Sequence, residues 1–263
     1  FRGKNKFASG DEIGADLLYN RGDNGRRRRG YGVGENGAMT VIAHIESQFH
    51  TKFGIPRQSG LVEELEADVV FEPQFRDLNA LRGLEGFSHI WLIWDFSEVR
   101  DKGWTPTVRP PRLGGNRRLG VFATRSPFRP NPIGLSCVRL AGIDPHTERG
   151  PVLRVRGADL MDGTPIYDIK PYLPYSDCKP EAVGGFASRP KEASLAVDIP
   201  ERWKALIPEG LLPALTGVLA QDPRPSYQQA PDRIYTMEFG GLEVKFQVEG
   251  DILNVCQISR RKS

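Results

Sequence analysis

Apolar residues in this chain recur in short runs that Pro and Gly interrupt, a pattern typical of β-strands. Apolar and polar residues alternate in the run Val152-Leu-Arg-Val-Arg156. The run His89–Phe96 is too uniformly apolar to face water, so it is expected to be a central strand. The predicted strands of this part are Val41–Glu46, Leu61–Phe71, His89–Phe96, Leu119–Ala123, Leu135–Ile143 and Val152–Ala158.

Helical periodicity is scarce between these strands. One short helix is expected over Pro73–Leu81, with Leu78 and Leu81 facing inward. Several short strands with few helices between them predict a mainly β protein built on a closed or nearly closed single-sheeted β-barrel. A doubly wound sheet would need repeated βαβ units, which the pattern does not contain.

Composition divides the chain into three parts. Residues 1–38 are rich in Gly and Arg and lack periodicity, so we expect a foreign or disordered segment; a basic RNA-binding arm is the alternative. Residues 39–190 are expected to form the barrel. Residues 191–263 predict a small α+β domain, with elements at Ala193–Ile199, Glu201–Ala220 (interrupted by Pro208 and Pro213), Arg233–Phe239, Glu243–Glu249 and Ile252–Ile258.

Composition also limits the function classes. Of the 263 residues, 39% are hydrophobic and 26% are charged, which is ordinary for a globular protein. No apolar run approaches the roughly 20 residues of a membrane helix. The three cysteines are widely spaced and the four histidines lack metal-ligand spacing. We therefore expect no metal, no membrane partner and a cytoplasmic location.

Positive charge is concentrated in one segment. Residues 102–143 carry eight basic residues and no acidic one, although the whole chain has a net charge of only +3. Prolines and glycines recur through this segment and stiffen it. Arginine on a rigid backbone suits a site for planar or phosphate-bearing anions, and a solvated basic face is the alternative.

Four segments place polar residues in turns beside predicted strand ends, where functional sites usually lie. They are residues 53–60, 86–91, 123–134 and 162–174. Taken singly, each has a structural explanation. His89 fits a hydrogen-bonded core histidine, and Asp162 fits a turn residue. Arg125 fits a surface charge, and Lys170 fits a packing residue whose charged end reaches solvent.

Together the segments resemble one family. The strings PRQSGL, GLEGFSHIWL, WTPTVRPPRLGGN, GVFATRSPFRPNPIGLS and DGTPIYDIKPYLPYSD are similar to the signature segments of the TsaA-like domain family. Its best-known members are the bacterial tRNA-methyltransferase O enzymes. The resemblance runs from about Met39 to Phe186, and residues 219–225 resemble the bacterial C-terminal extension of the family.

The resemblance implies a single-sheeted β-barrel that uses S-adenosylmethionine to methylate N6 of N6-threonylcarbamoyladenosine, next to the anticodon of threonine tRNAs. It also implies a homodimer with the cofactor near the subunit interface. Carried onto this chain, the cofactor-binding residues of the family are Pro56, Arg57, Gln58, His89, Ile90, Arg125, Leu135, Asp162, Gly163, Thr164 and Pro165.

The expected chemistry leaves several roles open. The acceptor nitrogen must lose a proton, and Asp162, Asp168 and His89 are the candidate bases, with Tyr167 less favoured; alternatively, alignment alone carries the reaction. The threonyl carboxylate of the substrate needs a cation, for which the candidates are Arg125, Arg129 and Lys170. The residues expected on tRNA phosphates are Arg109, Arg112, Arg117 and Arg118. The candidates for stacking on loop bases are Phe128, Tyr172 and Tyr175, although burial is the competing expectation for each.

Two other functions fit the same residues. A non-catalytic RNA-binding barrel would use the basic segment for phosphate contacts alone. A methyltransferase acting on a small anionic molecule would keep the cofactor site but not the tRNA, because one fold serves many substrates.

Overall fold

The computed structural model describes residues 39–114, 116–188, 195–224 and 233–261. The predicted N-terminal segment at residues 1–38 and the predicted boundary between residues 190 and 191 lie outside these ranges.

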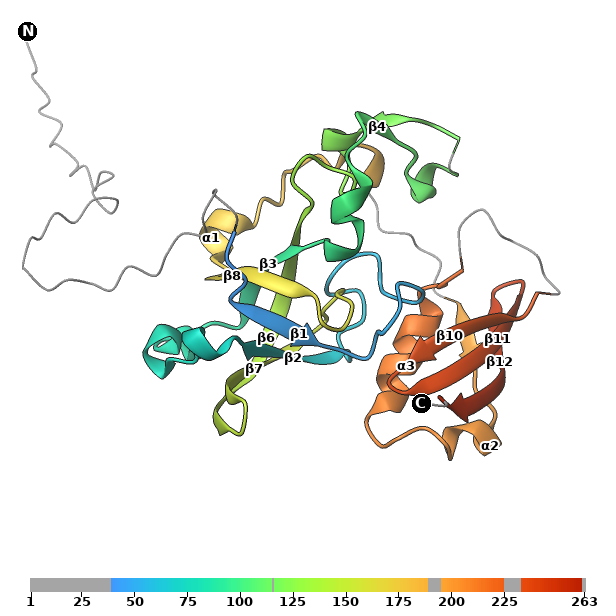
Figure 1. Ribbon diagram of the computed structural model, residues 1–263. Coiled ribbons are helices and arrows are strands. Elements are labelled where there is room, and N and C mark those ends of the chain that lie inside the picture. The colour runs from blue at the N-terminus through green and yellow to red at the C-terminus, as the bar shows by residue number, and fades with distance from the viewer. Residues whose placement is uncertain (1–38, 115, 189–194, 225–232, 262–263) are drawn as a thin grey trace, which may run out of the picture. The chain divides into compact units, whose positions relative to one another are not determined.

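Six strands form a closed antiparallel barrel (Figure 1). Around the barrel they follow the order β1, β2, β7, β6, β3, β8, and β8 pairs with β1 to complete the ring. Closure pairs the strands that an open sheet would leave as edges. This confirms the predicted β-barrel. The strands are β1 (Ala43–Glu46), β2 (Glu66–Phe71), β3 (His89–Asp95), β6 (Ile133–Thr147), β7 (Gly150–Arg156) and β8 (Pro165–Pro171).

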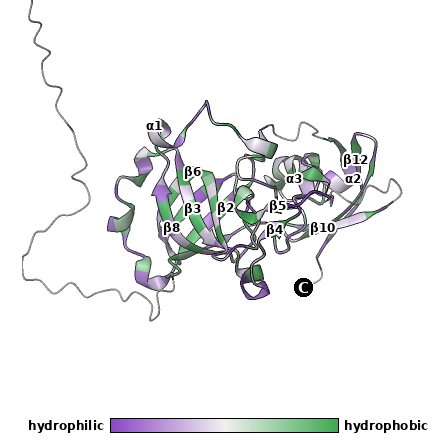
Figure 2. Ribbon diagram, turned by 90° about the horizontal axis from the view of Figure 1, so that it is seen from above, coloured by the Kyte–Doolittle hydropathy of each residue, from purple (hydrophilic) through white to green (hydrophobic). Residues whose placement is uncertain are grey.

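The barrel core follows from the alternation of side chains along each strand. In β3, Ile90, Leu92 and Trp94 are buried in the interior. His89, Trp91 and Ile93, which alternate with them, are partly exposed. β3 pairs with β6 on one side and with β8 on the other, so its predicted central position is confirmed. Apolar and polar positions are both visible along the barrel strands in Figure 2.

The sequence pattern did not predict β8. Its segment contains Pro165 and Pro171, and proline cannot donate to a strand ladder. In the structure these two prolines are the first and last residues of the strand, where a missing donor interrupts the ladder least. The residues between them pair with β3.

Other local predictions were also wrong. The predicted strand over residues 61–71 begins only at Glu66, because Val62 and Leu65 pack into the core of the C-terminal sheet. The predicted helix over Pro73–Leu81 is two separate 3-10 turns, Pro73–Phe75 and Leu78–Leu81. Leu81 is buried as expected, whereas Leu78 is 39% exposed.

The predicted strand at residues 119–123 is mostly a turn. Its first two residues form β5 (Leu119–Gly120), which pairs with β4 (Thr107–Val108), and the 3-10 turn Val121–Ala123 follows. A two-stranded ribbon this short cannot support itself, so Val121 contributes a buried anchor.

The C-terminal part forms a second sheet in the order β10, β11, β12, β9, with β9 parallel to β12. Buried residues of α3 and of this sheet share one hydrophobic cluster. Pro213 lies in the first turn of α3, where backbone N–H groups have no partner within the helix. Its missing N–H therefore removes no helical hydrogen bond, and the helix continues through it. The elements are β9 (Ala196–Asp198), α2 (Glu201–Lys204), α3 (Leu211–Ala220), β10 (Tyr235–Phe239), β11 (Leu242–Glu249) and β12 (Ile252–Arg260); α1 (Pro174–Asp177) lies between the two sheets in sequence.

α3 is ten residues long, and within the described ranges no helix has the length and apolar character to cross a bilayer.

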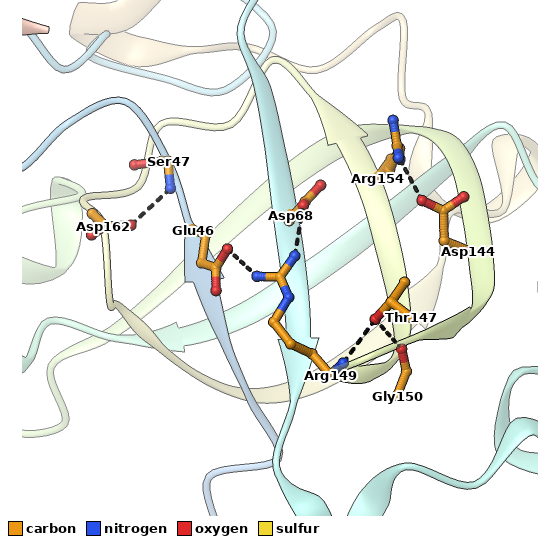
Figure 3. A network of polar contacts seen from close by, with 9 residues as sticks. All are labelled: Glu46, Ser47, Asp68, Asp144, Thr147, Arg149, Gly150, Arg154 and Asp162. Atoms are coloured by element: carbon orange, nitrogen blue, oxygen red, sulfur yellow. Dashed lines mark hydrogen bonds and ion pairs between the residues drawn. The ribbon is translucent and has the colours of Figure 1, made fainter. Parts of the chain in front are cut away.

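Arginine and carboxylate side chains from β1, β2, β6, β7 and the turn between β6 and β7 meet on the outer face of the barrel (Figure 3). Arg149 reaches both Glu46 and Asp68, and Arg154 Nε lies 2.6 Å from Asp144 Oδ2. Exposed pairs of this kind stabilise a fold by only about 0–1 kcal/mol each. Their clearer consequence is that this face carries balanced charge.

Candidate active site

A cavity of about 650 Å³ opens at one end of the barrel. Antiparallel pairing brings the end of β3 to the beginnings of β6 and β8. The turn at residues 55–58, the 3-10 turn Ser97–Lys102 and the loop at 124–129 complete the wall. The volume lies in the range of clefts that hold small ligands.

A hydrogen-bonded chain joins two residues of the cavity wall through a buried serine. Trp94 Nε1 donates to Ser136 Oγ at 2.9 Å, and Ser136 Oγ donates to Asp159 Oδ1 at 2.6 Å. An indole nitrogen can only donate, so the serine hydroxyl accepts from Trp94 and directs its own proton to Asp159. The chain therefore fixes Asp159 as an acceptor.

Gly134 makes room for the indole of this chain. A Cβ at position 134 would lie 2.2 Å from Cε2 of Trp94. On another side, the Trp94 ring contacts Phe96 with centroids 4.2 Å apart. The indole therefore fits on the cavity wall because Gly134, the second residue of β6, has no side chain.

Burial raises the pKa of the Asp159 carboxyl above its usual value. The hydrogen bond from Ser136, the backbone amides of Asp159 and Ser59, and the positive charge of Arg125 act in the opposite direction but do not cancel the effect of burial.

Two arginines on the loop after β5 bring positive charge to the cavity. Arg125 donates to Gln58 Oε1, which ties this loop to the turn at residues 55–58. Arg129 Nη1 donates to the carbonyl oxygen of Thr124 at 2.7 Å, and its guanidinium carbon lies 5.7 Å from the ring centroid of Phe122. Neutral groups of the protein therefore hold both guanidinium groups.

A third arginine neutralises the carboxylate at the end of β3. Asp95 is buried and bonds to Arg100, which also bonds to the hydroxyl of Tyr167. Burial and the nearby Asp95 charge raise the pKa of Tyr167 above its usual value.

Comparison with known proteins assigns the chain to a family. The profile of the tRNA-methyltransferase O N-terminal domain matches residues 44–178, and that of the TrmO C-terminal domain matches residues 194–261. The chain belongs to the tRNA-methyltransferase O family.

Several relatives cover most of the chain. A tRNA (adenine(37)-N6)-methyltransferase of Escherichia coli is 43% identical over 215 residues, which cover 79% of this chain and 91% of that protein. A Pseudomonas aeruginosa protein that carries the name of an S-adenosylmethionine-dependent methyltransferase is 39% identical over 231 residues, which cover 84% of this chain and 97% of that protein. A crystal structure of TrmO from Pseudomonas aeruginosa superposes with a TM-score of 0.68 at 33% identity, covering 84% of this chain and 98% of that chain.

The cavity brings together part of the cofactor set that the tRNA-methyltransferase O resemblance implies. Six of its eleven residues line the wall: Pro56, Arg57, Gln58, Arg125, Leu135 and Thr164. They come from three separate loops and from β6, so the fold gathers positions that lie far apart in the sequence.

Three further residues of that set lie in or next to the turn before β8. Asp162 Oδ1 accepts from the backbone N–H of Ser47 at 2.9 Å (Figure 3), and the N–H of Gly163 donates to the carbonyl oxygen of Ile45 at 2.8 Å. These bonds fix the turn to β1, while Pro165 begins β8 and pairs with the same strand. The turn thereby holds Thr164 at the cavity.

His89 and Ile90 lie at the opposite end of β3 from the cavity. His89 precedes Trp94 by five positions, which is roughly 16 Å along a strand. Ile90 is fully buried in the barrel core. The His89 ring contacts Tyr172, with centroids 6.3 Å apart.

None of the three candidate bases lines this cavity within the described part of the chain. Besides its bond to Ser47, Asp162 lies 3.3 Å from Nδ1 of His50. Asp168 lies 3.0 Å from Nζ of Lys170 on the outer face of the barrel, which also places Lys170 away from the cavity. The sequence instead missed Asp159, Trp94, Asp95 and Ser136, because the neighbours of these residues are revealed only once the pairing of the strands is known.

The arginines expected on tRNA are exposed where their side chains are described. Arg109, Arg117 and Arg118 face solvent, and Arg118 Nη1 donates to Thr107 Oγ1 at 3.1 Å. The side chain of Arg112 lies outside what the structure describes. Among the described residues, no ion pair involves a basic residue of segment 102–143.

Exposed aromatic side chains flank these arginines. Trp104 is 52% exposed and Phe122 is 74% exposed, and the sequence pattern singled out neither. Of the predicted stacking residues, Phe128 lines the cavity and Tyr175 is exposed, whereas Tyr172 packs against Trp91 with centroids 5.7 Å apart.

Proposed function

We propose that this chain is an S-adenosylmethionine-dependent tRNA methyltransferase that acts on N6 of N6-threonylcarbamoyladenosine, next to the anticodon of threonine tRNAs in the cytoplasm. The observation that carries this proposal is the cavity at the barrel end, where six residues of the implied cofactor set meet. Membership of the tRNA-methyltransferase O family and the names of the relatives support the same activity.

The residues of the cavity fit the methyl donor. Arg125 and Arg57 provide cations for its carboxylate, and Leu135 provides an apolar surface for its rings. Thr164 and the backbone of the neighbouring turn provide neutral partners for adenine. When bound, the donor supplies a methyl group activated by a positively charged sulfur, and the chain aligns that group with the acceptor nitrogen.

The homodimer is part of the proposal. Ile133 and Leu135 are 37% and 51% exposed and belong to the cavity wall, so the apolar wall continues onto the outer surface of β6. A second copy that covered this surface would remove it from water. It would also allow His89 to join a cofactor site from which its own chain separates it. Light scattering should give a dimer, and a monomer at micromolar concentration would contradict this part.

We place the tRNA on the surface that leads from the cavity to β4 and β5. This surface combines exposed arginines without ion-pair partners among the described residues with exposed Trp104 and Phe122. Cations neutralise phosphates, and aromatic faces stack on unpaired bases, which the anticodon loop offers.

The deciding experiment combines cofactor titration with nucleoside analysis. The full chain should bind S-adenosylmethionine in calorimetry and methylate tRNA that carries threonylcarbamoyladenosine, but not the same tRNA from a strain that lacks this modification. Mass spectrometry of purified isoacceptors tests the preference for threonine tRNAs. RNA binding without cofactor binding would indicate a non-catalytic barrel, and cofactor binding without any tRNA product would indicate a small anionic substrate.

A further inference from the structure

Three carboxylates line the cavity, and they differ in what surrounds them. Asp95 is paired with Arg100. Glu98 has a side chain that is 57% exposed and lies 3.9 Å from Nζ of Lys52. Asp159 is partly buried and accepts a hydrogen bond from a neutral hydroxyl, and among the described residues no ion pair holds it.

The contacts of Asp159 leave it able to accept one more proton donor. A carboxylate offers about four acceptor positions. The hydroxyl of Ser136 and the backbone amides of Asp159 and Ser59 use at most three of them. Because Asp159 belongs to the cavity wall, the remaining capacity is accessible to a ligand.

The surroundings of Asp159 also suit it to bind a proton. Its raised pKa makes it a stronger base than an exposed carboxylate, and a base works best when its pKa approaches the working pH. Arg125 is the cation that acts on it, from the loop after β5. The other charged groups that line the cavity are Lys52, Arg57, Asp95, Glu98 and Arg129.

We propose that Asp159 is a catalytic residue that accepts the proton lost by N6 of the substrate base during methyl transfer. This inference rests on the proposed function. A bond forms between N6 and the methyl carbon, the bond between that carbon and sulfur breaks, and its electron pair stays on sulfur as a neutral thioether. The N6 proton passes to Asp159, which releases it to solvent through the mouth of the cavity.

Ser136 is a positioning residue in this scheme. Its hydrogen bond orients the carboxylate and favours the ionised form, so it lowers the pKa of Asp159. Trp94 in turn orients the serine hydroxyl. Loss of the serine hydroxyl should therefore change the pH at which the base becomes active, which a purely structural role would not do.

The test is single-turnover methylation of threonylcarbamoyl-modified tRNA by Asp159→Asn, with S-adenosylmethionine affinity measured separately by calorimetry. Asparagine keeps the shape and the acceptor for Ser136 but is not a base. The rate should fall by roughly 100-fold or more, the range of general-base contributions. The dissociation constant for the cofactor should stay within about threefold of the wild-type value, because Asp159 acts on the proton of the substrate and not on the donor. Asp144→Asn, on the outer face of the barrel, is the matched control and should keep the wild-type rate.

Ser136→Ala provides an independent measurement. In the wild type the rate should fall as the pH drops through the pKa of Asp159, and in Ser136→Ala that fall should occur at higher pH. A near-normal rate in folded Asp159→Asn, or an unmoved profile in Ser136→Ala, would overturn the inference. A large loss of cofactor affinity with an unchanged saturated rate would do the same and would assign Asp159 to the ammonium group of the donor. A wild-type chain that leaves modified tRNA unmethylated would instead refute the proposed function, and the role of Asp159 with it.

Discussion

Gly134→Ala should destabilise the barrel and distort the cavity, although it adds a single methyl group. The new Cβ would overlap the indole of Trp94, with the nearest ring atom at 2.2 Å. The ring is confined because its nitrogen is bonded to buried Ser136 and its face contacts Phe96. Relief of the overlap therefore requires the indole to move, and that movement breaks the chain to Asp159.

The expected cost combines three contributions. The overlap between the new methyl group and the Trp94 ring costs about 2 kcal/mol, and loss of the hydrogen bond between Trp94 and Ser136 costs about 1 kcal/mol. Alanine lowers the conformational entropy of the unfolded chain relative to glycine, which offsets roughly 0.5 kcal/mol of this loss. The net loss of about 2.5 kcal/mol corresponds to a fall in Tm of roughly 5–10 °C for a protein of this size.

Gly142→Ala is the matched control, because it makes the same change on the same strand with no atom within 4 Å of the new Cβ. Differential scanning calorimetry should show Tm unchanged or slightly raised for Gly142→Ala and lowered for Gly134→Ala. S-adenosylmethionine affinity should fall only in Gly134→Ala. If the two variants have the same Tm, the close contact between Gly134 and Trp94 does not determine the shape of the cavity wall.

Three further substitutions test other parts of the site. Asp159→Asn should raise Tm at neutral pH. Because burial raises the pKa of the Asp159 carboxyl, the folded wild type loses stability as the pH rises through that pKa, and asparagine avoids this loss. At acid pH, where the carboxyl is protonated, the Tm of the variant should not exceed that of the wild type. Arg125→Ala should reduce methylation at least about tenfold, since hydrogen bonds to charged groups contribute roughly 1.5–3 kcal/mol; near-normal turnover would remove Arg125 from the site. Phe122→Ala should weaken tRNA binding in filter assays by about 5- to 150-fold, the equivalent of roughly 1–3 kcal/mol of base stacking. Phe122→Tyr should bind normally, and equal affinities of the wild type and Phe122→Ala would exclude stacking.

The sequence predicted the barrel but not how it closes. Short alternating runs and the scarcity of helical periodicity are local signals, and they located most of the strands. β8 gave no such signal, because the prolines at its two ends resemble those of a loop. The strand was recognisable only from its partners, β1 and β3. Similarly, Val62 and Leu65 looked like part of a strand because their apolar character does not reveal which core they enter.

The site was predictable as a set of segments but not as a set of contacts. Stiff polar turns and the family resemblance pointed to the loops that form the cavity wall. Asp159 gave no local signal, because it lies between β7 and β8 and its environment depends on Ser136 of β6 and Trp94 of β3. His89 stood out in sequence, yet it lies at the other end of β3 from the cavity.

The distribution of ion pairs explains how one protein of modest net charge can present a strongly basic surface. On the outer face formed by β1, β2, β6, β7 and the turn between β6 and β7, arginines meet carboxylates, as Arg149 and Arg154 do (Figure 3). Residues 102–143 contain no acidic side chain, so their arginines can find no such partner within the segment. In the described part of that segment they bond instead to neutral groups, as Arg125 does to Gln58 and Arg129 to Thr124. A neutral partner orients a guanidinium without cancelling its charge, which leaves that charge for the anions of a cofactor or of tRNA.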